Sequence, residues 1–266
     1  MEKPKFKKLI SSTVDFHDLP NAIDIANELG CGIEISRFGK LRELDKNFDA
    51  TLKHYKSALK DFEGEISLHG FFSNLSAASK DPLIREASRK RYHQSLEIAS
   101  EIGAKTVVFH TCYNNLLKHK DYQKVFFANN IEFFKEFIPH FEQAGIIATI
   151  ENVHEPDYHF IRNLVGAINS PNLKVTLDVG HINLHSEIPP SEWIKNYGIM
   201  LHHMHIHNNF KEEDSHSSLL NGDTDYIPVF QTIKEMHLNP LIVFEIFNEQ
   251  DLRESIKYFD ETLERI

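Results

Sequence analysis

Short β-rich runs alternate with longer amphipathic segments along nearly the whole chain. The β-rich runs cover residues 8–14, 32–36, 65–69, 106–110, 146–151, 174–178, 201–206 and 240–245. Segments with helical periodicity cover 19–29, 82–102, 121–144, 226–236 and 251–265. Runs such as TVVF and LIVF are apolar throughout, which is typical of parallel strands buried on both faces. Eight βα units in 266 residues predict a (β/α)₈ barrel formed by a single domain over residues 1–266.

The competing architecture is a doubly wound open sheet. It is disfavoured because no glycine-rich phosphate-binding fingerprint follows the first β-rich run. No Pro/Gly/Ser-rich linker divides the chain into two parts. Asp81 and Pro82 predict the start of one helix, and Gly103 and Gly145 predict the ends of two.

Composition narrows the classes of partner. A formal net charge of -10 works against the phosphate-neutralising surface of a nonspecific nucleic-acid binder, so we expect a small-molecule substrate rather than nucleic acid. Cys31 and Cys112 have no C-x-x-C spacing, which favours reduced thiols. The sequence contains neither a signal-peptide core nor an apolar stretch long enough to span a bilayer, so we expect a cytoplasmic protein without a membrane partner.

Six successive β-rich runs, the third to the eighth, have a residue that can bind a metal at their last position or, in the seventh run, one position before it. These residues are His69, His110, Glu151, Asp178, His205 and Glu245. In a barrel the C-terminal strand ends meet at one mouth, so the pattern predicts a metal site at that face. A single strand-end histidine is more often a satisfied polar group than a ligand. The whole set reverses that judgement, because buried carboxylates are costly unless they are paired, protonated or bound to a cation.

The seventh run carries three histidines on one face. His203, His205 and His207 alternate with residues of the other face, so all three can point into the barrel. We interpret His205 as the metal ligand. For His203 and His207 the favoured interpretation is a hydrogen-bonded polar residue.

Two further pairs of donors have short spacings. Asp178 and His181 flank Gly180, so both can face one pocket, and His181 is alternatively a substrate contact. Asp214 and His216 lie two positions apart, which lets an extended loop present both to one ion. A solvated acidic loop after KEED is the alternative for this second pair.

These motifs together resemble the xylose isomerase-like TIM-barrel superfamily. This superfamily contains the sugar-phosphate isomerases and epimerases, and endonuclease IV of AP endonuclease family 2. The resemblance covers nearly the whole chain. It is carried by SLHGFFSNLS, DPLIREASRKRYHQSLEIASEIGAKTVVFH, IENVHEP, LDVGHINLH, HMHIHNN with DSH, and VFEI.

The two branches of the superfamily imply different uses of one pocket. Resemblance to the isomerases implies that Glu151, Asp178, His205 and Glu245 hold one divalent cation, with Glu151 and Glu245 also serving as the acid/base pair and His181 contacting substrate. Resemblance to endonuclease IV implies a three-zinc cluster completed by His69, His110, His181, Asp214 and His216. Carboxylate and imidazole ligands suit Zn²⁺, Mn²⁺ or Co²⁺, so we expect one to three such ions.

Ligand count favours a hydrolase, whereas the segments LDVGHINLH and HIHNN look more like the isomerase branch. We therefore expect a metal-dependent isomerase or epimerase acting on a small sugar, sugar phosphate or polyol-derived ketone. A multinuclear phosphoester hydrolase is the alternative. A noncatalytic barrel that binds metal or ligand is the third hypothesis, disfavoured because a binding module needs no pair of poised carboxylates.

Residues beside these motifs are candidates for substrate or subunit contacts. Arg37 follows the second β-rich run and can bind an anionic substrate or form a loop salt bridge. Phe71 and Phe72 follow His69 and can stack on a sugar, although aromatic packing over the mouth is the favoured role. Trp193 and Tyr197 are candidates for the contact of a homo-oligomer, and packing within one subunit explains them equally well.

Overall fold

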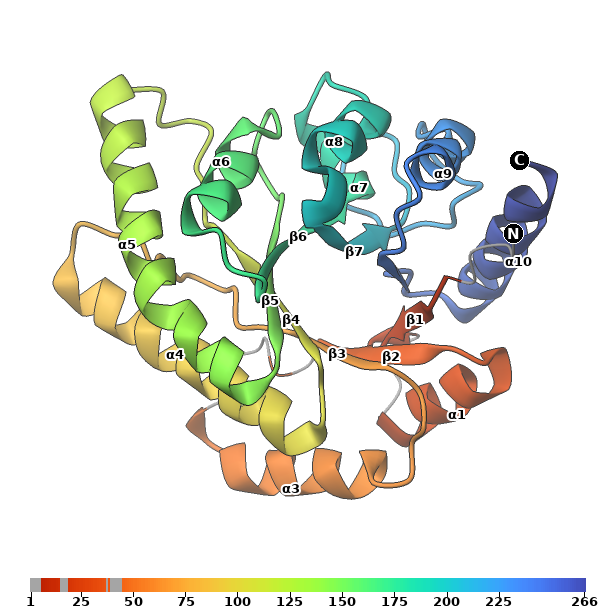
Figure 1. The fold of residues 1–266 in the computed structure, drawn as a ribbon. Coiled ribbons are helices and arrows are strands. Elements are labelled where there is room, and N and C mark those ends of the chain that lie inside the picture. Colours follow the sequence, from red (N-terminus) through yellow and green to blue (C-terminus); the bar gives the residue numbers. More distant parts are fainter. Residues whose placement is uncertain (1–5, 15–18, 37, 39–44) are drawn as a thin grey trace.

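The computed structural model describes residues 6–14, 19–36, 38 and 45–266. Within them, parallel strands form one closed barrel in chain order (Figure 1). The strands are β1 Lys8–Ser11, β2 Gly32–Ile35, β3 Ile66–His69, β4 Thr106–His110, β5 Ile147–Glu151, β6 Leu173–Asp178, β7 Leu201–Ile206 and β8 Leu241–Phe244. Each lies within one of the predicted β-rich runs or extends it by one residue, so the prediction of a (β/α)₈ barrel is confirmed.

Strand register decides which side chains fill the barrel interior. β8 closes the barrel by pairing with β1, where Leu9 lies beside Val243. In β7, His203 lies beside Leu241 and His205 lies beside Val243. Paired residues of parallel strands point to the same face, so both histidines lie inside the barrel with these apolar neighbours. Leu9, Leu241 and Val243 form a small apolar cluster of their own.

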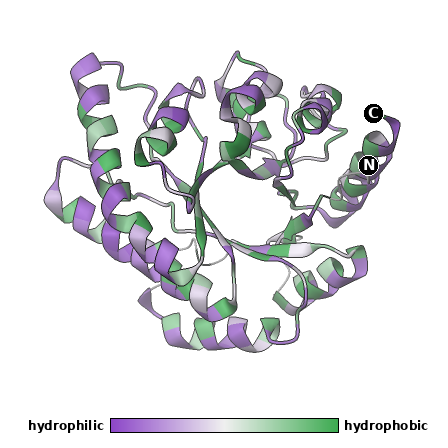
Figure 2. Ribbon diagram, in the orientation of Figure 1, coloured by the Kyte–Doolittle hydropathy of each residue, from purple (hydrophilic) through white to green (hydrophobic). Residues whose placement is uncertain are grey.

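Helices surround the barrel (Figure 1). Figure 2 shows hydrophobic residues concentrated in the strands and on the sides of the helices that face them. The helices are α1 Leu19–Leu29, α3 Phe48–Leu59, α4 Pro82–Ile102, α5 Lys120–Ala144, α6 His159–Ile168, α7 Val179–His185, α8 Pro190–Tyr197, the 3₁₀ turn η3 Gly198–Met200, α9 Tyr226–Glu235 and α10 Glu249–Arg265. None of the helices among the described residues combines the length and apolar character needed to cross a bilayer.

The predicted helix borders agree with the cap geometry. The Asp81 carboxylate accepts a hydrogen bond from the Leu83 amide (2.8 Å), and Pro82 occupies the first turn of α4. Gly103 and Gly145 end α4 and α5 with φ of 80° and 65°, the left-handed region that favours glycine. Helices α3, α6, α7 and α8 were not predicted from the sequence.

An aromatic layer fixes the two longest helices, α4 and α5, against β4. Tyr92 stacks on Phe109 with ring centroids 4.3 Å apart and an interplanar angle of 8°. Phe137 and Phe141 of α5 meet the same Phe109 ring edge to face. The Tyr92 hydroxyl donates a hydrogen bond to the His110 carbonyl (3.1 Å), so this packing also holds the C-terminal end of β4 in place.

Candidate metal centre

Four strand-end side chains converge at the C-terminal mouth of the barrel. They are Glu151 of β5, Asp178 of β6, His205 of β7, and Glu245, which directly follows β8. One ligand atom of each lies within 4.8 Å of those of the other three. His205 Nδ1 is the centre of the group, at 3.2 Å from Glu151 Oε1 and 3.1 Å from Glu245 Oε2. Asp178 Oδ2 lies 3.6 Å from the same nitrogen.

Neighbouring charges outweigh the effect of burial on the pKa values of this group. Burial alone would raise the carboxyl pKa values, yet nearby imidazoles hold the pKa of Glu151 well below its ordinary value and lower that of Glu245. Burial alone would lower the pKa of His205, but Glu34, Glu151 and Glu245 hold it well above its ordinary value. The electrostatics therefore favour a positive charge at the point where the three carboxylates meet.

A second group of donors lies beside Glu151. Glu151 Oε2 is 3.0 Å from His110 Nε2 and 3.3 Å from His69 Nε2. Because Oε1 faces His205, the Glu151 carboxylate lies between two groups of imidazoles. Such a carboxylate can bridge two cations.

A third group lies on the loop that follows β7. Asp214 Oδ2 is 3.2 Å from His216 Nε2 and 3.3 Å from His181 Nε2. His207 Nε2 is 3.8 Å from Asp214 Oδ1 and 3.3 Å from Asp178 Oδ1, which joins this group to the central one. The strand-end and loop donors named from the sequence are therefore brought together at one mouth.

Local hydrogen bonds orient His181 and Asp178. Asp178 is the N-cap of α7, and its carboxylate accepts a hydrogen bond from the His181 amide (2.6 Å). The Asn152 side chain donates to the Asp178 carbonyl and accepts from the Asp178 amide, both at 2.9 Å. The Asn152 carbonyl lies 2.9 Å from His181 Nδ1, so that nitrogen carries the hydrogen and Nε2 faces Asp214. Sequence reasoning missed Asn152, although it directly follows Glu151.

The loop bearing Asp214 and His216 is held by backbone and side-chain contacts. Asn208 and Ser217 exchange two backbone hydrogen bonds of 3.0 Å, which folds the segment back on itself. His216 adopts a φ of 47° and donates from Nδ1 to the Glu245 carbonyl (2.7 Å). Burial lowers the pKa of His216, but Glu245 and Asp214 raise it to about 9. Residues 210–215 of this loop are exposed, as a solvated acidic loop would be, but Asp214 contacts the imidazoles of His181 and His216.

A cavity of about 310 Å³ opens above the central group. Its walls include His69, His181, Glu245, Phe72 and Phe247. A larger cavity of about 920 Å³ lies at the opposite end of the barrel, beside Gly32 and Glu65. None of the donor groups found among the described residues borders that second cavity, so the candidate site is at the C-terminal mouth.

Phe71, one of the expected substrate contacts, is buried. It is only 2% exposed and packs under the Arg91 guanidinium, 5.3 Å from its ring centroid, whereas its neighbour Phe72 lines the cavity. Arg37, the other expected contact beside the motifs, lies outside the described residues. Trp193 and Tyr197 are fully buried and pack edge to face with centroids 5.9 Å apart, which agrees with packing within the subunit.

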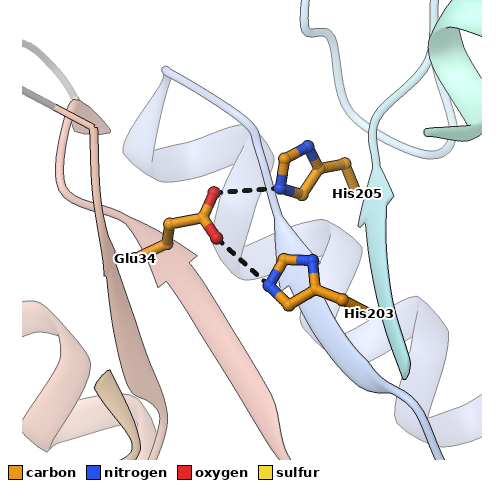
Figure 3. Close-up of side chains that lie close together, drawn as sticks. All are labelled: Glu34, His203 and His205. Atoms are coloured by element: carbon orange, nitrogen blue, oxygen red, sulfur yellow. Dashed lines mark ion pairs between the residues drawn. The ribbon is translucent and has the colours of Figure 1, made fainter. Parts of the chain in front are cut away.

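Sequence reasoning also missed Glu34, a fully buried residue of β2. Its carboxylate lies between the rings of His203 and His205 (Figure 3), at 3.1 Å and 2.9 Å from their Nε2 atoms. The signal was a carboxylate in the middle of the otherwise apolar run GIEI, where an unpaired charge is costly. His203 therefore contacts a buried carboxylate rather than the cavity.

Comparison with known proteins places the chain in one family. Residues 23–262 match the model of the xylose isomerase-like TIM barrel family. Two uncharacterised proteins of Methanocaldococcus jannaschii are similar: one is 29% identical over 79% of this chain and 74% of its own length, the other 27% identical over 87% of each chain.

Solved structures show the same architecture. A D-tagatose 3-epimerase-like protein is 26% identical with a TM-score of 0.82 over 97% of both chains. A Thermus thermophilus protein soaked with ZnCl₂ is 21% identical, with a TM-score of 0.79 over 96% of both chains. A D-psicose 3-epimerase is 15% identical, with a TM-score of 0.77 over 97% of this chain and 99% of its own, a likeness of fold alone. With the family match, these findings show that the chain belongs to the xylose isomerase-like TIM barrel family.

Proposed function

We propose that this chain is a divalent-metal-dependent isomerase or epimerase of a small sugar, sugar phosphate or polyol-derived ketone. Family membership and likeness to a D-tagatose 3-epimerase-like protein support this class of reaction. The cavity of about 310 Å³ supports a small substrate, because it lies at the lower end of the volumes of small-molecule sites, roughly 300–1,000 Å³.

The central donor group fits a divalent cation. Bonds from Zn²⁺ to imidazole nitrogen or carboxylate oxygen are about 2.0–2.2 Å long, so two ligands of one ion lie at most roughly 4.4 Å apart. His205 Nδ1 lies 3.1 to 3.6 Å from its three carboxylate neighbours, within that limit. We assign Glu151, Asp178, His205 and Glu245 as the ligands, with Zn²⁺, Mn²⁺ or Co²⁺ as the ion.

A cation held by these four residues would polarise a substrate carbonyl and its neighbouring hydroxyl and so acidify the adjacent C–H bond. Glu151 and Glu245 approach His205 Nδ1 from different strands, and both border the cavity. One carboxylate removes the carbon-bound proton, and the other returns a proton to the same carbon on the opposite face or to its neighbour. His181, fixed by Asn152 through Nδ1, borders the cavity and is the proposed substrate contact.

The observation that carries this proposal is the pair of glutamates meeting at one imidazole nitrogen beside a small cavity. We expect Glu245→Gln to lower turnover by about 10²–10⁴-fold, because an amide can neither remove nor return the proton. The assay is exchange of the substrate C–H with deuterated solvent, using D-fructose, D-psicose and D-tagatose as candidates. Glu254→Gln, an exposed carboxylate on α10, is the matched control. Undiminished exchange in the Glu245 variant would remove that residue from the mechanism.

A second candidate function is phosphoester hydrolysis by a multinuclear centre. The flanking donor groups favour it: His69 and His110 beside Glu151, and His216 beside Asp214, are more ligands than one ion needs. Clustered ions would supply hydroxide and stabilise the leaving oxygen.

Metal content and one variant separate the two candidates. For the isomerase we expect elemental analysis of protein purified without chelator to give about one ion per chain, and His216→Ala to keep most of its activity. For the hydrolase we expect two or three ions, release of phosphate from model esters, and loss of an ion and of rate in His216→Ala.

A further inference from the structure

The Glu34 carboxylate lies inside the barrel and contacts His205 of the central donor group on the side away from the cavity. It lies on β2, across the interior from β7, and its residue is fully buried. One oxygen, Oε1, contacts His205 Nε2 at 2.9 Å, and the other, Oε2, contacts His203 Nε2 at 3.1 Å (Figure 3). The Ser67 hydroxyl donates to Oε2 (2.8 Å) and fixes the carboxylate from the neighbouring strand.

The position of Glu34 decides which nitrogen of His205 is available for an ion. Carboxylates contact both nitrogens of His205, but a cation at the central group would take up the charge of Glu151 and Glu245 beside Nδ1. Glu34 is then the carboxylate that still faces the ring, and its closeness to Nε2 favours hydrogen on that nitrogen, because an ionised carboxylate only accepts hydrogen bonds. A lone pair on Nε2 would instead face the negative oxygen at 2.9 Å and be repelled. With hydrogen on Nε2, the lone pair of the neutral ring is on Nδ1, which faces Glu151 and Glu245.

We propose that Glu34 is a positioning residue that holds His205 in the Nε2–H tautomer and so directs Nδ1 to the divalent cation. This rests on the proposed function, because it assumes an ion at the central group. Glu34 itself touches neither the cavity nor substrate. A carboxylate behind a ligating imidazole fixes the orientation of the ring and makes its free nitrogen more basic, and loss of such a partner typically costs 10–100-fold in metal affinity.

The test uses metal-free wild type, Glu34→Gln and Glu65→Gln. The affinity of each protein for Co²⁺ alone is measured by competition with a chelator. Glu65 precedes β3 at the opposite end of the barrel and pairs with Lys7, so it is the matched control. We expect Glu34→Gln to bind Co²⁺ about 10–100-fold more weakly, with an altered visible spectrum, and Glu65→Gln to bind as wild type does. Equal affinity of all three proteins would overturn the role of Glu34 and leave the proposed function standing. A wild type that binds no Co²⁺ would overturn both.

A second measurement needs no variant and therefore decides the question if Glu34→Gln does not fold. In ¹⁵N-histidine spectra of the Zn²⁺-loaded wild type, we expect the His205 Nε2 to carry hydrogen and Nδ1 to show the shift of a metal-bound nitrogen. The reverse assignment would overturn the proposal. Loss of one whole equivalent of metal in Glu34→Gln would also overturn it, because Glu34 would then be a ligand of a separate ion.

Discussion

Substituting Gly180 by alanine tests whether the close packing of α7 positions the donors of the mouth. Gly180 lies in the first turn of α7, and a Cβ atom there would lie 2.0 Å from Cε1 and 2.4 Å from Nδ1 of His207. Ordinary contact begins near 3.4 Å, so the ring would have to retreat by about 1.4 Å. The ring of His216 stacks on the His207 ring at 4.0 Å, and His207 Nε2 contacts Asp178 at 3.3 Å. These two contacts restrict movement of the ring.

Two opposing effects set the expected magnitude. Overpacking a buried site costs about 1–3 kcal/mol, whereas alanine in place of glycine within a helix gains up to about 1 kcal/mol. We expect a net loss of about 1–2 kcal/mol in the free energy of unfolding, measured by urea denaturation. Gly166 of α6 is the matched control, because its added Cβ meets nothing within 4 Å. Gly166→Ala should be as stable as wild type or up to about 1 kcal/mol more stable. A Gly180→Ala variant that gains stability as the control does would refute the packing argument.

Three other predictions concern side chains outside the three donor groups. Burial lowers the pKa of His202 to about 4. As the pH falls below the ordinary pKa of histidine, the unfolded chain therefore binds a proton at His202 that the folded chain does not yet bind. Stability should then fall, by up to about 3 kcal/mol, as the pH drops from 6.5 to 4, and His202→Asn should flatten that part of the profile of urea midpoint against pH. Phe134→Ala should lower the free energy of unfolding by about 3–5 kcal/mol in the same assay, since the ring is fully buried, and a loss below about 1 kcal/mol would contradict its place in the core. Burial raises the pKa of Cys31 to about 11 and of Cys112 to about 12, so both thiols should react with a disulfide reagent at pH 8 at least roughly 100-fold more slowly than in urea; equal rates would count against their burial.

Strands such as β4 and β8 were predictable because a parallel barrel strand is buried on both faces, which favours a short, continuous apolar run. The bounds of α4 were predictable as well, since Asp81, Pro82 and Gly103 are local signals that act within one turn. The helix α7 was not predicted, because its seven residues span barely two turns and carry little periodicity. In α3 only Tyr55 and Leu59 are buried, so its apolar face is also a weak signal.

The sequence by itself determined which donor side chains lie at or next to the strand ends, because alternation along a strand and the apolar residues that precede its end are local properties. Only the tertiary structure decided which atoms meet there. Glu34 and His205 belong to strands far apart in the chain, and their contact depends on closure of the barrel between β8 and β1. That closure leaves one nitrogen of His205 facing Glu34 and the other facing Glu151 and Glu245. The orientation of a side chain between two partners follows from packing in three dimensions, which no local pattern of residues encodes.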